Sequence, residues 1–497
     1  MKKLILIILS AALILSLAAC GNKTEEAPHN AGSDTAEVSE GIKINLSDSS
    51  ITVDGKPISA SADADVYAAN DIVFYLEEQG FTYGEGEASD EHSQEEADAH
   101  TVVHITKAGT YILSGTLSLG QIAVDLGKDA EDDPNAVVTL VLDNVNITCT
   151  VAPAVIFYNV YECGDKDNAS MNVDTSKAGA NIIIADGSSN IITGSHVAKI
   201  YKEYTLNDKG TKVKDSKKLH KYDAAFYSKM SMNIDGAGIL IINADNEGLG
   251  TEMHLTVNGG NISIFSGNDG INTNEDGVSV TTINGGTVTI TVTGETGEGD
   301  GIDSNGWLVI NGGKVSAFAC GSSADSGIDA SNGVYINGGT VYSTGNMLDE
   351  LRGDSTYAVF AFTERQKAGP CYTLKNSSGD IVFEVSPTND FTYMLLSSDL
   401  FSEGEYTLWK DNTQLGASMG EFGGMGGGMG GNQPPQGERP EMPEGEAPQM
   451  PQGQPPEGFG DRAPGGFGNM PAGDAVSNIF VITKGANYFS NVSVWVE

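Results

Sequence analysis

Short stretches of alternating apolar and polar residues dominate the chain. In residues 137–148 the apolar positions are mainly Val, Leu and Ile, and polar residues separate them in its second half. A period of two residues is typical of β-strands that bury one face, and no helical period of 3.6 residues runs between the copies of the central repeat. The pattern therefore predicts an all-β protein.

A phrase of six residues occurs four times in the centre of the chain. Its copies begin at Val257, Ile283, Ile310 and Ile336, and the asparagines of their Asn-Gly-Gly turns lie 26, 27 and 26 residues apart. A propeller blade usually needs ~40 residues, so the spacing favours one coil of a solenoid. Glycine permits the positive φ angles that stacked corners require. We predict a parallel β-helix with the isoleucines inside and coils rising ~4.8 Å each.

A second phrase recurs in step with the first and carries oxygen-bearing side chains. Its copies lie at 269–272, 300–303 and 326–329, with a weaker copy at 247–250. Stacking would place their first and fourth residues in columns, and Ca²⁺, which takes oxygens at 2.3–2.6 Å, would fit between stacked carboxylates. A row of turn-forming Asp and Asn residues that satisfy backbone amides is the alternative. The predicted calcium ligands are Asp269, Asn272, Asp300, Asp303, Asp325, Asp329 and Glu252.

Two aromatic residues flank the Asn-Gly-Gly turns at the opposite parity to the inward isoleucines. Trp307 and Tyr335 should therefore face outwards on neighbouring coils. Exposed rings can stack on the apolar faces of sugars, so both are predicted ligand-binding residues. Isolated exposed aromatics under a C-terminal cap would give the same pattern.

The N-terminus predicts export and a lipid anchor. Lys2 and Lys3 precede an apolar run that ends in Leu17-Ala18-Ala19-Cys20, the pattern of a bacterial lipoprotein signal peptide. The run is shorter than the ~20 residues of a membrane span, which argues against a transmembrane anchor. We expect a signal peptide at 1–20 and lipidation of Cys20. The mature protein would be held at the outer face of the bacterial cytoplasmic membrane, or at the cell surface.

The remaining chain is predicted to divide into five parts. A tether and leading segment (21–70) precedes the β-helix (71–350) and a C-terminal β cap (351–416). Residues 417–475 contain 17 glycines and 10 prolines and are predicted to be a disordered linker. The last part, 476–497, has the pattern of a strand that packs back on the body.

Charge excludes one class of partner. The net charge of −40 opposes binding to a phosphate backbone, and it suits an exported protein that holds cations. The segment 199–221 is an exception, because it contains eight lysines. It is expected to be either a solvated loop or a positively charged segment that binds an acidic polymer. Cys149, Cys163, Cys320 and Cys371 form no zinc-binding pattern and are expected to be buried free thiols, with one disulfide between Cys149 and Cys163 as the alternative.

Several segments together resemble a known bacterial family. They are the phrase Thr-Lys-Ala-Gly-Thr-Tyr-Ile-Leu-Ser-Gly-Thr-Leu at 106–117, its continuation at 120–125, the strand-like 138–148, the two repeated phrases, and 374–380 and 406–409. They are similar to the carbohydrate-binding, calcium-containing right-handed parallel β-helix lipoproteins, whose fold resembles calcium-dependent pectate lyases. The resemblance implies binding of plant cell-wall polysaccharide, cellulose or polygalacturonate-like, with calcium on the helix wall. Many relatives carry lysine where this chain has Asn272, Asp303 and Asp329.

Catalysis is less expected than binding. A polysaccharide lyase needs calcium together with an unprotonated Lys or Arg as the base. Lys229, Lys314 and Arg352 are the basic residues near the repeats, and spacing places none of them beside the carboxylate columns. We therefore predict a non-catalytic polysaccharide binder. A calcium-dependent lyase and a structural surface scaffold or adhesin remain the alternatives.

Overall fold

The computed structural model describes residues 40–74, 92–197, 201–210, 213–218, 222–418 and 477–496. The predicted signal peptide with Cys20, part of the predicted tether and nearly all of the predicted linker lie outside these residues. The described part is nearly all β. Its helical elements are α2 (Gln94–Asp98) and two short 3-10 helices, η2 (Lys128–Asp132) and η3 (Lys166–Asn168). The all-β prediction is confirmed. No helix among the described residues is long and apolar enough to cross a membrane.

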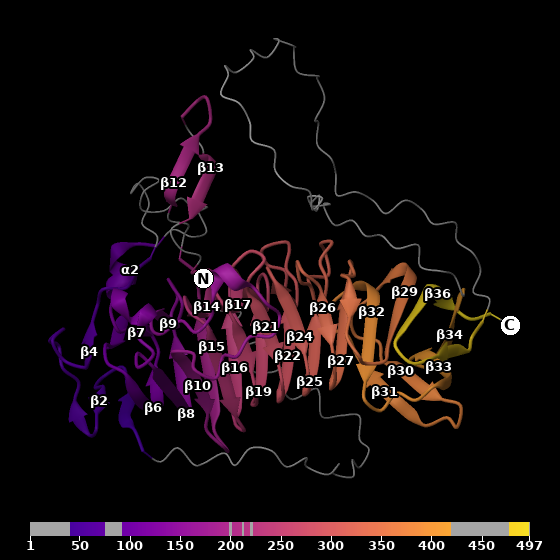
Figure 1. Cartoon of the computed structure of the whole chain (residues 1–497), viewed down its shortest axis with the longest axis horizontal. Helices are drawn as coiled ribbons and strands as arrows, with labels where there is room; N and C mark the ends of the chain where they lie inside the picture. Colours follow the sequence, from indigo (N-terminus) through magenta and orange to yellow (C-terminus); the bar gives the residue numbers. More distant parts are fainter. Residues whose placement is uncertain are drawn as a thin grey trace, which may run out of the picture. The chain divides into compact units, whose positions relative to one another are not determined.

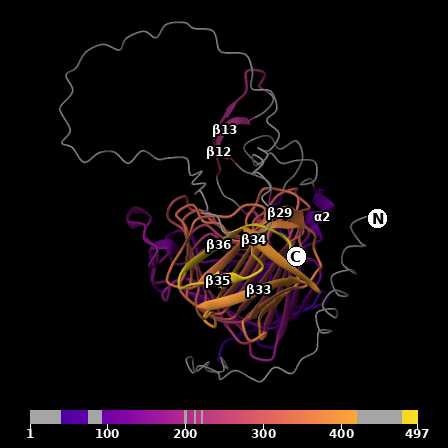
Figure 2. The same cartoon turned by 90° about the vertical axis from the view of Figure 1, so that its right-hand side faces the viewer.

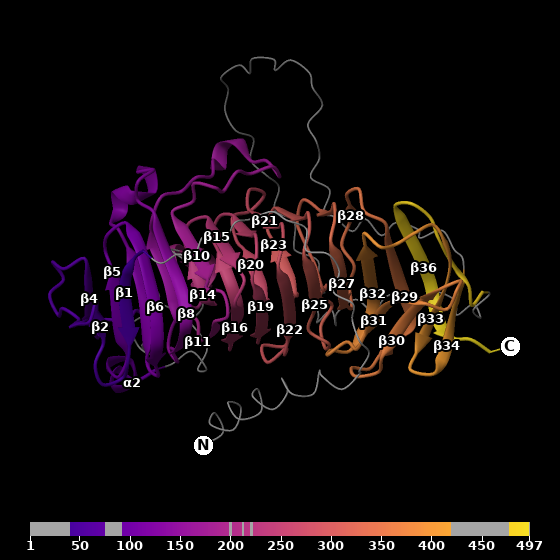
Figure 3. The same ribbon diagram turned by 90° about the horizontal axis from the view of Figure 1, so that it is seen from below.

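The central repeats form three ladders of parallel strands, in which each strand pairs with its equivalent one repeat later (Figures 1 and 3). The first ladder contains β15 (Met232–Gly236), β18 (Leu255–Val257), β21 (Val280–Ile283), β24 (Trp307–Ile310) and β26 (Val334–Ile336). The second contains β16 (Ile239–Ala244), β19 (Asn261–Ser266), β22 (Thr287–Val292), β25 (Lys314–Phe318) and β27 (Thr340–Gly345). The third, in a separate sheet, contains β14 (Ala224–Ser228), β17 (Glu247–Thr251), β20 (Ile271–Thr273) and β23 (Ile302–Ser304).

Earlier strands extend the same two sheets towards the N-terminus. One sheet receives β1 (Ile42–Leu46), β2 (Thr52–Val53), β3 (Lys56–Pro57), β6 (Gly109–Leu117), β8 (Val138–Thr148), β10 (Ala180–Ile184) and β11 (Ser189–Gly194). The sheet of β14 receives β4 (Val66–Ala69), β5 (Thr101–Ile105), β7 (Gly120–Asp125) and β9 (Val155–Asn159). The lysine-rich segment forms an antiparallel pair, β12 (Tyr201–Leu206) with β13 (Val213–Lys218).

Apolar residues stack in register inside the repeats. Ile283 pairs with Ile310, Ile310 pairs with Ile336, and all three are fully buried. Ile271 and Ile302 form the equivalent column in the third ladder. Burial of such side chains stabilises the fold by roughly 25 cal/mol per Å² of apolar surface. The same parity that buries these residues turns their strand neighbours outwards.

The Asn-Gly-Gly corners also stack. The side-chain amide of Asn284 donates to Oδ1 of Asn258, that of Asn311 to Asn284, and that of Asn337 to Asn311, each at 2.9 Å. The second glycine of the turn has a positive φ, +76° at Gly313. Each corner therefore fixes the register of the next.

The C-terminal strands close one end of the ladders (Figure 2). They are β28 (Leu351–Arg352), β29 (Tyr357–Gln366), β30 (Tyr372–Asn376), β31 (Ile381–Val385), β32 (Phe391–Ser398), β33 (Gly404–Lys410), β34 (Thr413–Ser418), β35 (Phe480–Ile482) and β36 (Ala486–Val494). Strand β32 pairs antiparallel with β27, and β36 pairs with β29 and β34. A second apolar cluster, which includes Phe360, Phe391 and Phe480, forms their core.

Candidate functional site

The third ladder brings the repeated acidic phrase into two columns. Pairing of Leu249 with Ile271, Ile271 with Ile302, and Ile302 with Ile328 sets the register. The first residues of the phrases, Glu247, Asp269, Asp300 and Ser326, then follow one another, as do the fourth residues, Gly250, Asn272, Asp303 and Asp329. The glycine at the second position is required by packing. A Cβ on Gly301 would lie 2.3 Å from the carbonyl oxygen of Gly327.

Three of these carboxylates converge. Asp300, Asp303 and Asp329 each offer an oxygen, and the three oxygens all lie within 4.8 Å of one another. All three residues are half-buried. We name them the carboxylate triple. An all-oxygen, all-anionic group of this kind fits a hard cation such as Ca²⁺ and lacks the nitrogen or sulfur ligands typical of zinc sites.

Burial and mutual repulsion act on these groups together. Desolvation raises the pKa of Asp300 to about 9, helped by the neighbouring charges of Asp269 and Asp329. Desolvation likewise raises the pKa of Asp269 and of Asp329 to about 7. It also raises the pKa of Glu247 well above its usual range, and Asp223 and Asp269 add to the effect. The ionised column is therefore unfavourable unless a cation compensates it.

Backbone amides contact the same carboxylates. The N–H of Asp300 donates to Oδ1 of Asp269 at 2.7 Å, and the N–H of Ser326 donates to Oδ1 of Asp300 at 2.6 Å. Asp325 accepts from the N–H of Gly299 at 2.6 Å and from the hydroxyl of Ser323. These carboxylates therefore do accept hydrogen bonds from backbone amides, as the alternative interpretation of the sequence expected. Each of these named bonds uses only one of the two oxygens of a carboxylate.

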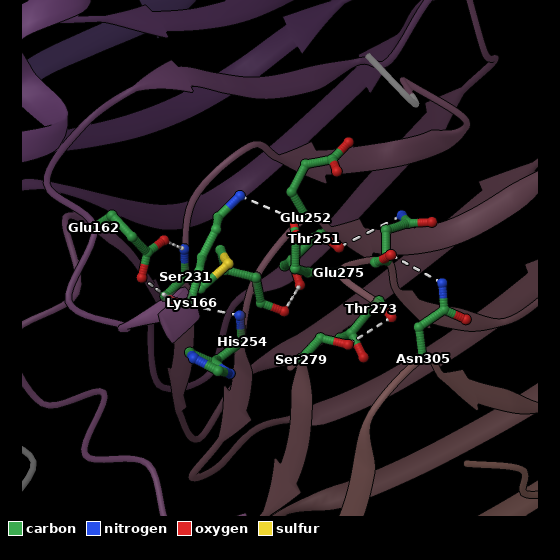
Figure 4. A network of polar contacts seen from close by, with 12 residues as sticks. Glu162, Lys166, Ser231, Thr251, Glu252, His254, Thr273, Glu275, Ser279 and Asn305 are labelled. Atoms are coloured by element: carbon green, nitrogen blue, oxygen red, sulfur yellow. Dashed lines mark hydrogen bonds and ion pairs between the residues drawn. The ribbon is translucent and has the colours of Figure 1, made fainter. Parts of the chain in front are cut away.

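Glu252, another predicted ligand, is not part of the carboxylate triple. Its carboxylate accepts a hydrogen bond from the hydroxyl of Tyr227. Its backbone carbonyl accepts the N–H of Glu275, whose carboxylate forms an ion pair with Lys166 at 2.8 Å (Figure 4). The reason is register. Tyr227 on β14 pairs with Gly250 on β17, so its hydroxyl meets the side chain two residues further along.

Glu247 was missed by the sequence reasoning. Its side chain accepts a hydrogen bond from the amide of Asn272 at 2.9 Å, and that amide also lies 3.3 Å from Asp269. The signal was present in the weak fourth copy of the phrase, whose first residue is acidic like those of the two central copies.

The two predicted aromatic residues are half-buried on the first ladder. Trp307 begins β24, and Tyr335 on β26 pairs with Val309, at the parity opposite to the buried Ile310 and Ile336. Tyr335 has a partner, because Arg352 donates to its hydroxyl at 2.8 Å and lies over its ring at 5.6 Å. Sequence spacing gave no sign of this contact with β28.

The four described cysteines are free thiols. Cys149 and Cys320 are buried, and Cys163 and Cys371 are partly exposed. Burial raises the pKa of Cys149 to about 12 and that of Cys163 to about 11, so neither is a reactive thiolate at neutral pH.

Both the ladders and the acidic columns fall within a region that matches a known family. Residues 99–358, more than half of the 497, match the family described as carbohydrate-binding domain-containing proteins. The chain belongs to this family.

Two individual proteins are similar. A carbohydrate-binding domain-containing protein of Acetivibrio thermocellus is 33% identical over 163 residues, which cover 33% of this chain and 44% of the relative. The chain thus spans less than half of that relative. A solved structure of a polysaccharide lyase-like protein from C. thermocellum, a gadolinium derivative, is 23% identical with a TM-score of 0.34. That alignment covers 63% of this chain and 97% of the solved chain.

Proposed function

We propose that this protein is a cell-surface lipoprotein that binds polysaccharide on a calcium-bearing wall of a right-handed parallel β-helix. Its expected ligand is a polymer of the cellulose or pectate type. Membership of a carbohydrate-binding family supports the polysaccharide, and the three parallel ladders support the β-helix. The observation that carries the proposal is the carboxylate triple of Asp300, Asp303 and Asp329 at the third ladder.

Charge explains why a cation would be needed for an acidic ligand. A chain of net charge −40 repels a polyuronate, and the triple concentrates that charge at one place. Bound calcium would offset two of the three negative charges of the ionised triple and accept sugar oxygens at its remaining coordination positions. Asp300, Asp303 and Asp329 would hold the ion, with Asp325 close to the same column through its contact with Gly299.

The environment of Arg352, the basic residue closest to the end of the first ladder, supports a binding function rather than lyase chemistry. Arg352 is held by Glu350 through two contacts, of 2.7 and 3.1 Å, and by the hydroxyl of Tyr335. These partners raise the pKa of Arg352, so its guanidinium stays protonated and cannot remove a proton from a uronate. On this proposal the protein retains its polymer without cleaving it.

The test is retention of the mature protein on insoluble pectate, cellulose and other polysaccharides, in calcium and then in a chelator. We expect retention that the chelator abolishes and that Asp303→Asn weakens. Asp63→Asn, which removes the same charge from an exposed site, serves as the matched control. No retention on any polymer would refute the binding function, and release of ultraviolet-absorbing unsaturated sugars would identify a lyase.

The lipid anchor is tested separately. Palmitate labelling of the cells that make the protein should label the wild type and not Cys20→Ser. Equal labelling of the two forms would refute lipidation at Cys20.

A further inference from the structure

Glu247, Asp269 and Asn272 form a buried polar group one repeat before the carboxylate triple. Asn272 Nδ2 lies 2.9 Å from Oε1 of Glu247 and 3.3 Å from Oδ2 of Asp269. Glu247 is 6% exposed and Asn272 is 7% exposed. A single amide nitrogen therefore bridges two carboxylates that come from adjacent repeats.

Two oxygens of this group have no partner. Oε2 of Glu247 and Oδ1 of Asn272 are both shielded from solvent, and neither accepts a hydrogen bond. Leaving a buried polar group unsatisfied costs about 1–3 kcal/mol, and more when the group is charged. Two such unpartnered oxygens in one group indicate that a ligand is needed to complete it.

Rotation of one amide turns the group into a set of oxygen ligands. The nitrogen and oxygen of an Asn amide are nearly isosteric, so a half-turn of the Asn272 amide exchanges them. Three oxygens would then face one another, with separations of 2.9 and 3.3 Å taken from the present nitrogen position. Neighbouring oxygens around Ca²⁺ at 2.3–2.6 Å are about 3 Å apart, so this spacing suits a hard cation.

Asp269, a member of this group, lies next to the carboxylate triple and uses its two oxygens for different partners. Its Oδ1 accepts the backbone N–H of Asp300, whereas its Oδ2 faces Asn272. We propose that Glu247, Asp269 and Asn272 form a second site for a hard divalent cation such as Ca²⁺, distinct from the site at Asp300, Asp303 and Asp329. The inference goes beyond the proposed function, because it requires neither polysaccharide binding nor occupancy of the triple.

The test counts bound calcium in chelator-stripped mature protein after equilibrium dialysis against Ca²⁺, by elemental mass spectrometry. The wild type should hold two ions, Glu247→Gln one, Asp329→Asn one and the control Asp63→Asn two. Glu247→Gln keeps the length of the side chain, and circular dichroism verifies that it folds. Two ions in Glu247→Gln would overturn the inference. One ion in the wild type that Asp329→Asn removes would overturn it while the proposed function stands.

A second measurement does not depend on the folding of Glu247→Gln. Tyr227 Cδ2 and Glu247 Oε2 lie 3.2 and 3.5 Å from the point where a Cβ on Gly250 would sit, so Tyr227 is close to the proposed ion. Tb³⁺ bound there should luminesce when tyrosine is excited. Tyr227→Phe should weaken that signal at an unchanged ion count. An undiminished signal would place the sensitised ion elsewhere and overturn the inference.

Discussion

The backbone N–H of Asp300 donates a hydrogen bond of 2.7 Å to Oδ1 of Asp269, which lies 31 residues earlier in the chain. Ser326 repeats the contact with Asp300 one strand further on, at 2.6 Å. Each carboxylate thus fixes the start of the next repeat. The same hydrogen bonds hold negatively charged carboxylates close together. The contacts that set the register of the repeats therefore also make a bound cation favourable.

Asp300→Asn should separate these two roles. The Asn side chain still offers an oxygen to the N–H of Ser326, and it removes a group that is unfavourable when ionised. Without calcium, the variant should unfold at no lower temperature than the wild type. Calcium at 100 times its Kd for the carboxylate triple should stabilise the wild type by about 2.7 kcal/mol through that ion, and the variant should lose this contribution.

Thermal unfolding in calcium and in a chelator checks this prediction. Asp63→Asn should keep the full calcium-induced rise in Tm, since it removes the same charge from an exposed position. If Asp300→Asn keeps that rise as well, Asp300 does not bind the ion.

Two glycines with nearly equal φ angles give a matched pair for the corner geometry. Gly313 has φ of +76° and Gly277 has φ of +70°. A Cβ on Gly313 would lie 2.8 Å from the carbonyl oxygen of Gly285, whereas a Cβ on Gly277 would meet nothing within 4 Å. Gly277→Ala should cost about 1 kcal/mol for the backbone conformation alone. Gly313→Ala should cost more than about 2 kcal/mol because the stacked turns must also move apart.

Denaturant unfolding of the two variants measures the difference. Equal decreases in the free energy of unfolding would show that the Asn-Gly-Gly turns accommodate a Cβ without destabilisation. Close stacking of the turns would then contribute nothing to the stability of the ladders.

The period of the repeat allowed the ladders to be predicted, because a spacing of 26 or 27 residues places Asn258, Asn284 and Asn311 in one column. The columns of Asp300 and Asp303 follow by the same argument. Contacts that depend on a different strand could not be found in this way. Glu252 is engaged by Tyr227, which belongs to no copy of the phrase.

Arg352 illustrates the same limit. It reaches Tyr335 from β28, a strand of two residues that carries no copy of the repeat. A contact of this kind depends on how the chain returns after the last complete repeat, and no periodic signal encodes that path. The extra carboxylate of Glu247 could be located in the sequence, but its unpartnered oxygen is apparent only once neighbouring side chains are placed.

Trp307 should contribute to polymer retention if sugars stack on the first ladder. Trp307→Ala should weaken retention by about 5- to 10-fold, the size expected for loss of one stacking contact of about 1 kcal/mol. Trp307→Phe should recover part of that loss, because it keeps a flat ring. Binding isotherms on the retained polymer provide the measurement, and identical isotherms for wild type and Trp307→Ala would remove Trp307 from the binding surface.

His254 should make the fold sensitive to acid. It is 2% exposed, and its Nδ1 accepts the backbone N–H of Val280 at 3.1 Å, so the folded state holds a neutral ring. Burial lowers the pKa of His254 to about 4, against about 6.5 in an unfolded chain. As the pH falls from 6.5 to 4, the unfolded state takes up a proton that the folded state does not. Stability from this group is therefore complete above pH 6.5, and about 3 kcal/mol of it is lost by pH 4.

His254→Asn isolates that contribution, because Asn offers an oxygen to Val280 and does not titrate. The comparison is necessary because the carboxyls of Asp269, Asp300 and Asp329, whose pKa values are raised, stabilise the fold as pH falls through the same range. Denaturant unfolding from pH 7 to pH 4, in chelator, should show the wild type losing about 3 kcal/mol more than the variant. Parallel curves for the two proteins would mean that His254 accepts its proton in the folded state and that the buried ring does not set the acid limit of the fold.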